Sequence, residues 1–139
     1  MNMLNKGLLL LVLSVFAAGI VNAASLENGM VLNVEGAPGY YIYVNGYASP
    51  IPSPEVYQCM GLWKKKTRNV KISKQQLDSM PKTAFLIRGS DRKVYRVDGS
   101  TRRLVPNAQV FKKLAFNERE IIEVADNTIN CIKEGPPLH

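Results

Sequence analysis

The chain has 139 residues, a formal net charge of +7 and 46% hydrophobic residues, which fits one basic domain. Its only histidine is the last residue, His139, so the composition excludes chemistry that needs a histidine base or several histidine ligands. The basic balance indicates attraction to anionic surfaces without choosing among them, and solubility alone would also explain it.

Residues 1–23 have the order of a secretory signal peptide. Lys6 supplies a positive charge, Gly7 to Ile20 form an uncharged apolar run, and Val21-Asn22-Ala23 precedes a cleavage site after Ala23. An uncleaved anchor is less favoured, because the run is shorter than the roughly 20 residues that span a bilayer. We therefore expect residues 24–139 to be a secreted or periplasmic domain without a transmembrane segment.

The first half of this domain, about residues 30–86, predicts a β-hairpin followed by a helix. Asn45-Gly46 lies between short β-prone runs and is a strong signal for a type I′ turn. Ser53 and Pro54 then fit the N-cap and first residue of a helix that Gly61 closes.

A brief strand at residues 69–72 and a second helix complete this half. Ser73 has capping-box spacing to Gln76, and Pro81 ends the helix.

The second half, about residues 87–139, repeats the pattern. Asp98-Gly99 matches the first turn, Asn107-Ala108 the first helix start, and residues 121–124 the short strand. Asp126 is expected to cap the last helix. One such unit buries little apolar surface alone. We therefore predict an α+β fold in which two tandem repeats pack as one small domain.

Cys59 and Cys131 both lie in the exported part. An even number of cysteines in an oxidising compartment favours one disulfide. The two residues fall on the first helix of one repeat and the second helix of the other, so a bridge would join the repeats. Two unpaired thiols are the alternative.

The two halves share the pattern Val-Asn/Asp-Gly, a polar stretch, and Ile/Val-Pro-Ser/Asn-x-x-Val-Tyr/Phe, with a tyrosine shortly before the valine in each half. This pattern, ending in Gly135-Pro136-Pro137-Leu138, resembles short tandem repeats of secreted bacterial proteins that often accompany cell-wall or surface domains. The first half departs at its end, where Lys82-Thr83-Ala84-Phe85-Leu86 stands instead. The resemblance implies a non-catalytic accessory module over about residues 40–138.

The sequence has neither a Gly-x-Ser-x-Gly elbow nor a phosphate-binding glycine-rich loop. Cys59 has no histidine that could activate it as a nucleophile. Carboxylates gather in the second half, and a glycosidase needs two of them across a cleft. They are interleaved with Arg119, which is typical of a solvated face: Glu118, Glu120, Glu123 and Asp126. We expect no enzyme activity, no cofactor and no metal.

Basic and aromatic residues are the candidates for ligand binding. One group follows the first helix: Trp63, Lys64, Lys65, Lys66 and Arg68. A second lies around the second hairpin: Arg92, Lys93, Arg96, Arg102 and Arg103. If the repeats stack, the two groups could form one face. The alternative is that these charges protect exposed strands from aggregation.

Tyrosines crowd the first hairpin and could add an aromatic strip. Tyr41 and Tyr47 are candidates for stacking on sugars, whereas Tyr43 and Tyr57 are expected in the core.

Two kinds of function fit this sequence. The first is an exported binding module for an anionic polymer, a glycan, a membrane surface or an acidic protein. The second is a protein-partner role, as an inhibitor, an immunity protein or a subunit of an extracellular assembly. Nucleic acid is not favoured as a partner.

Overall fold

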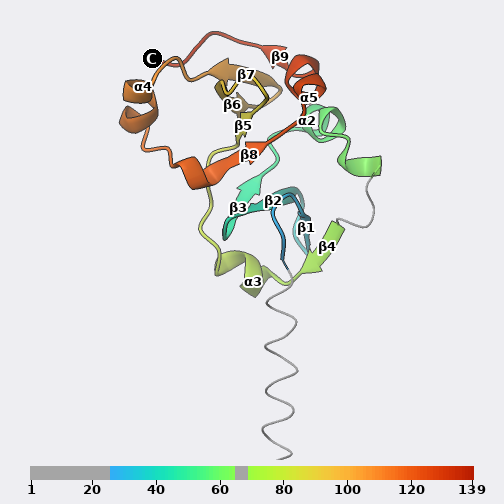
Figure 1. Ribbon diagram of the computed structural model, residues 1–139. Coiled ribbons are helices and arrows are strands. Elements are labelled where there is room, and N and C mark those ends of the chain that lie inside the picture. The colour runs from blue at the N-terminus through green and yellow to red at the C-terminus, as the bar shows by residue number, and fades with distance from the viewer. Residues whose placement is uncertain (1–25, 65–68) are drawn as a thin grey trace, which may run out of the picture.

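The computed structural model describes residues 26–64 and 69–139. The expected signal peptide, residues 1–23, lies outside the described residues, as do Lys65, Lys66 and Arg68. The described parts form a mixed α+β fold with two small sheets, one above the other in Figure 1, and this confirms the predicted fold class. Among them, no helix has both the length and the apolarity that crossing a membrane requires.

The first sheet has the strand order β3-β2-β1-β4. Strand β2 is antiparallel to both of its neighbours, and β4 pairs parallel with β1. The strands are β1 (Val31–Val34), β2 (Tyr40–Val44), β3 (Tyr47–Pro50) and β4 (Asn69–Ile72). The helical segments of this half are α2 (Pro54–Cys59), the 3-10 turn η1 (Leu62–Lys64) and α3 (Lys74–Asp78).

The second sheet has the order β8-β5-β6-β7-β9. Its strands are β5 (Leu86–Arg88), β6 (Val94–Asp98), β7 (Thr101–Leu104), β8 (Ile121–Glu123) and β9 (Lys133–Glu134). The helical segments are α4 (Ala108–Lys113), the 3-10 turn η3 (Glu118–Glu120) and α5 (Asp126–Cys131).

The two halves share one strand order. Read as β7-β6-β5-β8, four strands of the second sheet match β3-β2-β1-β4 in order and in direction. The fifth strand, β9, pairs parallel with β7, and Lys82 makes an isolated parallel bridge to Ala48 on β3 at the matching edge. The halves therefore have the same topology, while the tandem repeat stays our interpretation of the sequence.

Local side-chain chemistry begins the helices largely as predicted. Ser53 Oγ accepts a hydrogen bond from the amide of Val56 at 3.2 Å, and Asn107 Oδ1 accepts one from Val110 at 2.9 Å. Ser73 and Gln76 form the expected capping box at the start of α3.

The cap expected from Asp126 is wrong. Ala125 is the N-cap of α5 and makes no side-chain hydrogen bond to the helix. Asp126 instead reaches across to the β5–β6 turn, where its carboxylate accepts hydrogen bonds from the amide and the hydroxyl of Ser90.

The two hairpin turns are not the same. Asn45 and Gly46 have φ values of 48° and 89°, as a type I′ turn requires. In the second hairpin Asp98 pairs with Thr101, so the turn residues are Gly99 and Ser100 rather than Asp98 and Gly99. Gly99, with φ 56°, occupies the first turn position, where a type II′ turn places glycine.

The main hydrophobic core is shared by both halves. Val31, Ile42 and Val56 from the first half pack in one cluster with residues of the second half that include Ile87 and Tyr95. A smaller cluster lies between the other face of the first sheet and Leu77 of α3. Since burial of apolar side chains is the main favourable term in folding, the shared cluster makes the two sheets one domain.

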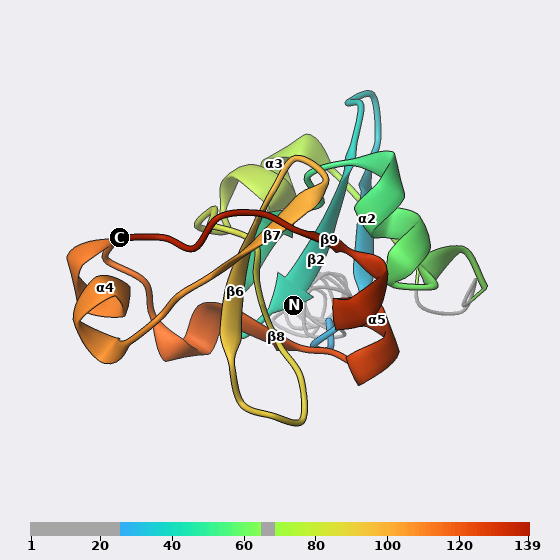
Figure 2. The same cartoon turned by 90° about the horizontal axis from the view of Figure 1, so that it is seen from above.

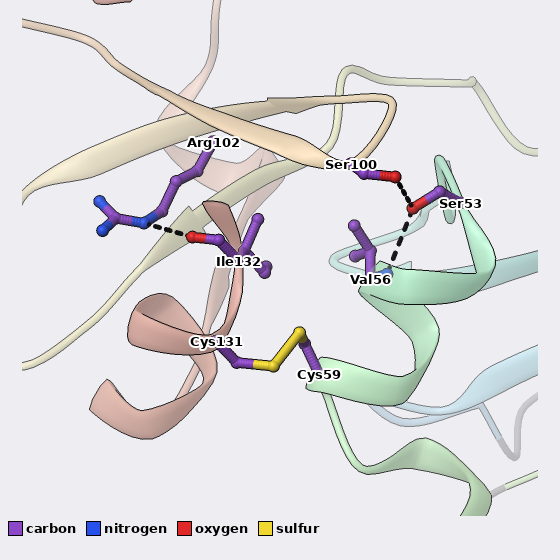
Figure 3. Close-up of a disulfide and its surroundings, with 7 residues drawn as sticks. All are labelled: Ser53, Val56, Cys59, Ser100, Arg102, Cys131 and Ile132. Carbon is purple, nitrogen blue, oxygen red and sulfur yellow. Dashed lines mark hydrogen bonds between the residues drawn. A yellow bond between two sulfur atoms is a disulfide. The ribbon is translucent and has the colours of Figure 1, made fainter. Parts of the chain in front are cut away.

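A disulfide also joins the two halves, and its Cys59 packs against this core. Cys59 at the end of α2 is bonded to Cys131 at the end of α5, with an S–S distance of 2.06 Å and a sequence separation of 72 (Figure 3). The bridge therefore joins the elements predicted from the sequence, the first helix of one half and the second helix of the other.

Candidate functional site

Arg102 and Arg103 are engaged in contacts within the fold. Arg102 lies with its guanidinium carbon 4.7 Å from the centre of the Tyr95 ring, and its Nε donates to the carbonyl of Ile132 at 2.9 Å (Figure 3). Arg103 Nε donates to the carbonyl of Pro136 at 2.9 Å. Only 12% of the Arg102 side chain and 27% of the Arg103 side chain are exposed. Both arginines hold the C-terminal segment against β7.

The other candidates from the sequence do not gather at one described site. Lys64 is exposed at the end of η1, and the side chain of Trp63 lies outside the described part of the structure. Tyr41 packs partly buried against the smaller cluster, and Tyr47 against the main core. Tyr43 and Tyr57 are also partly buried against these cores, as expected for them.

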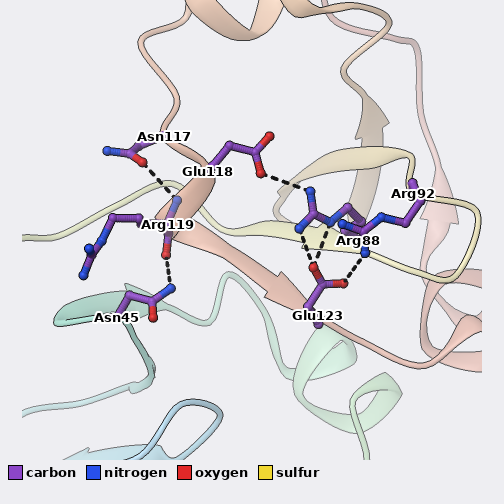
Figure 4. Close-up of polar contacts among 7 residues, drawn as sticks. All are labelled: Asn45, Arg88, Arg92, Asn117, Glu118, Arg119 and Glu123. Carbon is purple, nitrogen blue, oxygen red and sulfur yellow. Dashed lines mark hydrogen bonds and ion pairs between the residues drawn. The ribbon is translucent and has the colours of Figure 1, made fainter.

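Arg88 forms ion pairs with two of the carboxylates of the second half, Glu118 and Glu123. Its guanidinium bonds to Glu123 and to Glu118, the latter at 3.1 Å, and Arg92 lies 3.5 Å from Glu123 (Figure 4). The hydrogen bond to Glu123 is the main reason why the pKa of Arg88 is raised above its usual value. Glu118 and Glu123 are thus held as ion-pair partners of an arginine.

A hydrogen bond beside this cluster links the two halves. Asn45 Nδ2 in the first hairpin turn donates to the carbonyl of Arg119 in η3 at 2.8 Å (Figure 4).

An open groove of about 370 Å³ lies between the β5–β6 turn, the end of β7 and helix α4. We call it the α4 groove. Its apolar lining consists of Val94, Leu104, Val105, Pro106, Ala108 and Phe111. Its polar lining consists of Arg92, Lys93, Asn107 and Glu118. Helix α4 lies at the edge of the molecule opposite α2 and α5 (Figures 1 and 2).

The charge of the α4 groove is basic. Arg92 and Lys93 are exposed, with 65% of the Arg92 side chain accessible to solvent. Lys112 and Lys113 add two exposed cations in the last turn of α4. Glu118 is the acidic lining residue, and its carboxylate is paired with Arg88. The groove therefore joins an apolar floor to the two exposed cations Arg92 and Lys93, with Arg92 also 3.5 Å from Glu123.

A second open groove, lined by Pro54, Glu55, Tyr57, Gln58, Cys59 and Cys131, has the opposite character. Its charged lining residue is Glu55, whose carboxylate accepts a hydrogen bond from Ser100 at 3.1 Å. Hydrogen bonds from its own backbone amide, from Ser100 and from Ser53 lower the pKa of Glu55. This groove presents a negative charge and does not suit an anion.

The described residues offer no set of ligands for a metal. Within residues 26–64 and 69–139, no three histidine, cysteine, aspartate or glutamate side chains gather in an arrangement that could hold an ion.

The comparisons with known proteins give a weak likeness to solved structures. No family model matches the sequence, and no curated protein is similar to it. Among solved structures, the chain is similar to one described as the structure of the periplasmic assembly from the ESX-5 inner membrane complex. The TM-score is 0.32 and the identity 9%, over 82% of this chain and 41% of that one. A likeness this low does not show a shared fold.

Proposed function

We propose that this chain is a non-catalytic binding module that acts outside the cytoplasm and holds an anionic ligand at the α4 groove. The observation that carries the proposal is the pairing of an apolar floor with Arg92 and Lys93 on the rim, and with Lys112 and Lys113 next to it. Cations grouped around a concave surface raise the local concentration of anionic ligands.

The state of the neighbouring carboxylates supports a binding role over a catalytic one. A catalytic carboxyl group must come within hydrogen-bond distance of the proton that it transfers. The carboxylates of Glu118 and Glu123 are instead bonded to the Arg88 guanidinium. The disulfide supports the compartment, because such bonds form and persist in oxidising environments.

The test is retention on immobilised poly-L-glutamate at rising ionic strength. Variant Arg92→Glu/Lys93→Glu reverses the two rim charges. The matched control, Lys71→Glu/Lys74→Glu, makes the same change in net charge at two exposed lysines of the first half. We expect the rim variant to bind about tenfold more weakly than the control and to elute at lower salt, because close charge pairs contribute more than remote ones. Equal weakening in both variants would show attraction by net charge alone and would refute the proposed site.

A further inference from the structure

Val94 and Tyr40 occupy the same position in the two halves. The amide of Val105 donates to the carbonyl of Val94 at 2.9 Å, and the amide of Ile51 donates to the carbonyl of Tyr40 at the same distance. Val94 pairs with Arg88 on β5, and Tyr40 pairs with Asn33 on β1, in the matching registers. The two side chains can therefore be compared directly.

Phe111 and Tyr57 are the second matched pair. Each lies four residues after the helix N-cap and donates its amide to the carbonyl of that cap, Asn107 for Phe111 and Ser53 for Tyr57. In the first half Tyr40 stacks on Tyr57, with ring centres 5.3 Å apart. In the second half Phe111 contacts Phe116 edge-on at 5.7 Å, and Val94 is too small to take the place of a tyrosine ring. The α4 groove thus lies where the first half has an aromatic stack, in which Tyr40 remains 42% exposed.

We infer that the α4 groove between Val94 and Phe111 receives one aromatic or aliphatic side chain from an acidic segment of a partner protein. This inference rests on the proposed function and names its ligand class. The inserted side chain takes the place that the Tyr40 ring has in the first half, and the acidic residues that flank it face Arg92 and Lys93.

The shape and lining of the groove favour a polypeptide over a glycan or a small molecule. The floor is apolar, and the Asn107 side-chain oxygen already accepts a hydrogen bond from Val110, whereas sugar hydroxyls need polar partners. The groove is open, whereas sites for small molecules bury most of their ligand's surface. A partner protein can bind such an open groove by inserting a single side chain, because the rest of the partner covers the surface around the groove.

The test uses the 15N-labelled protein titrated with two peptides and followed by NMR. The first is acetyl-Glu-Glu-Phe-Glu-Glu-amide, and the second has alanine in place of phenylalanine. We expect the phenylalanine peptide to shift the amide signals of Val94, Val105 and Phe111, and to bind at least about tenfold more tightly than the alanine peptide. Absence of these shifts at peptide concentrations of about 1 mM, or equal binding of both peptides, would overturn the inference.

Variant Val94→Tyr tests the insertion of a side chain into the α4 groove separately from the binding of an anionic ligand by the rim cations. It places in the second half the residue that the first half already has, so the fold accommodates it, and it fills the groove. We expect it to lose the preference for phenylalanine and to bind both peptides as weakly as the wild type binds the alanine peptide. If Val94→Tyr keeps that preference, the side chain does not insert here, although the charge site stands. If Arg92→Glu/Lys93→Glu leaves both affinities unchanged, the proposed function fails as well.

Tyr40→Val is the matched control in the first half. It removes the stack on Tyr57, but the residues that match Arg92 and Lys93 there are Pro38 and Gly39. We expect its peptide affinities to equal those of the wild type. A new phenylalanine-selective site in the first half would contradict the requirement for the rim cations.

Discussion

The Asp126 carboxylate accepts hydrogen bonds from the hydroxyl and the amide of Ser90, and these bonds lower its pKa. Gly89, beside this contact, leaves the space that the carboxylate uses, because a Cβ at Gly89 would lie 2.7 Å from Asp126 Oδ1. One side chain thus fixes the β5–β6 turn, the turn that carries Arg92 and Lys93, to the start of α5.

Replacing Asp126 by asparagine is expected to change how stability depends on pH. The pKa of Asp126 is lower in the folded protein than in the unfolded chain, where it is about 3.9. Its contribution to stability is therefore full above that value and is lost as the pH falls through the folded-state pKa. We expect the wild type to be more stable than Asp126→Asn at neutral pH and the difference to shrink on acidification. Urea unfolding of both proteins from neutral pH to below the folded-state pKa of Asp126 measures this difference. A difference that stays constant with pH would contradict the contact between Asp126 and Ser90.

The arginines of β7 show that the sequence alone does not tell which basic side chains are accessible to a ligand. The sequence indicates Arg102 and Arg103 as members of a basic face. Asp98, close to them in the chain, pairs with Arg103, but the Nε atoms of both arginines donate to the carbonyls of Ile132 and Pro136, more than 25 residues further on. Arg92 and Lys93 belong to the same sequence cluster and remain exposed. Only the fold separates the structural arginines from the accessible ones.

At the level of the element, α2 and α4 end in the same backbone conformation with different residues. Gly61 follows α2 with φ 67°, and Ala115 follows the cap of α4 with φ 59°. The left-handed region costs little for glycine and about 1 kcal/mol or more for a residue with a Cβ. Helix α4, which lines the groove, therefore has a strained C-terminus that α2 lacks.

Exchanging the two residues is expected to give effects of opposite sign. Ala115→Gly should stabilise the protein by about 0.5–1 kcal/mol, because relief of strain exceeds the added entropy of the unfolded chain. Gly61→Ala should destabilise it by about 1 kcal/mol, because nothing relieves the strain that the new Cβ introduces. Thermal unfolding of both variants measures this, and a loss of stability in Ala115→Gly would show that the backbone there is not left-handed.

The elements that the sequence predicts are those with a local cause. The turn at Asn45-Gly46 and the caps at Ser53, Ser73 and Asn107 depend on residues at most four positions apart. Strands β1, β5 and β9 were not predicted. Strands β1 and β5 each pair antiparallel with the next strand and parallel with one more than 25 residues away. Strand β9 has two residues, too few for a sequence pattern to indicate it, and pairs parallel with β7.

The groove could have been found in part from the sequence. Aligning the halves through Ile51-Pro52 and Val105-Pro106 places Val94 opposite Tyr40, which indicates a difference in size at one position. The sequence did not show that this difference leaves an open groove. The groove also depends on the contact of Phe111 with Phe116, which only the structure shows.

At the level of the molecule, the two sheets have the same topology, but they face the shared core with opposite sides. Ile42 faces the shared core from β2, while its counterpart on β6, Arg96, points to the opposite face and Tyr95 enters the core. The first half thus offers one face of its sheet and the second half the other. This head-to-tail arrangement leaves an outer face on the second sheet that carries Arg88, Arg96 and Arg103 with their acidic partners. A charged outer face of this kind ends a stack of repeats in solenoid proteins.

Native-state hydrogen exchange with the disulfide present and removed tests most directly whether the two sheets form one cooperative body. In the variant Cys59→Ser/Cys131→Ser, loss of a bridge with a separation of 72 residues should lower the free energy of global unfolding by about 4 kcal/mol. Because the sheets share one core, the slowest amides of β1 and β5 should lose protection by the same amount. If only one sheet loses protection, the halves are separately stable units, and the packing of both sheets as one domain is contradicted.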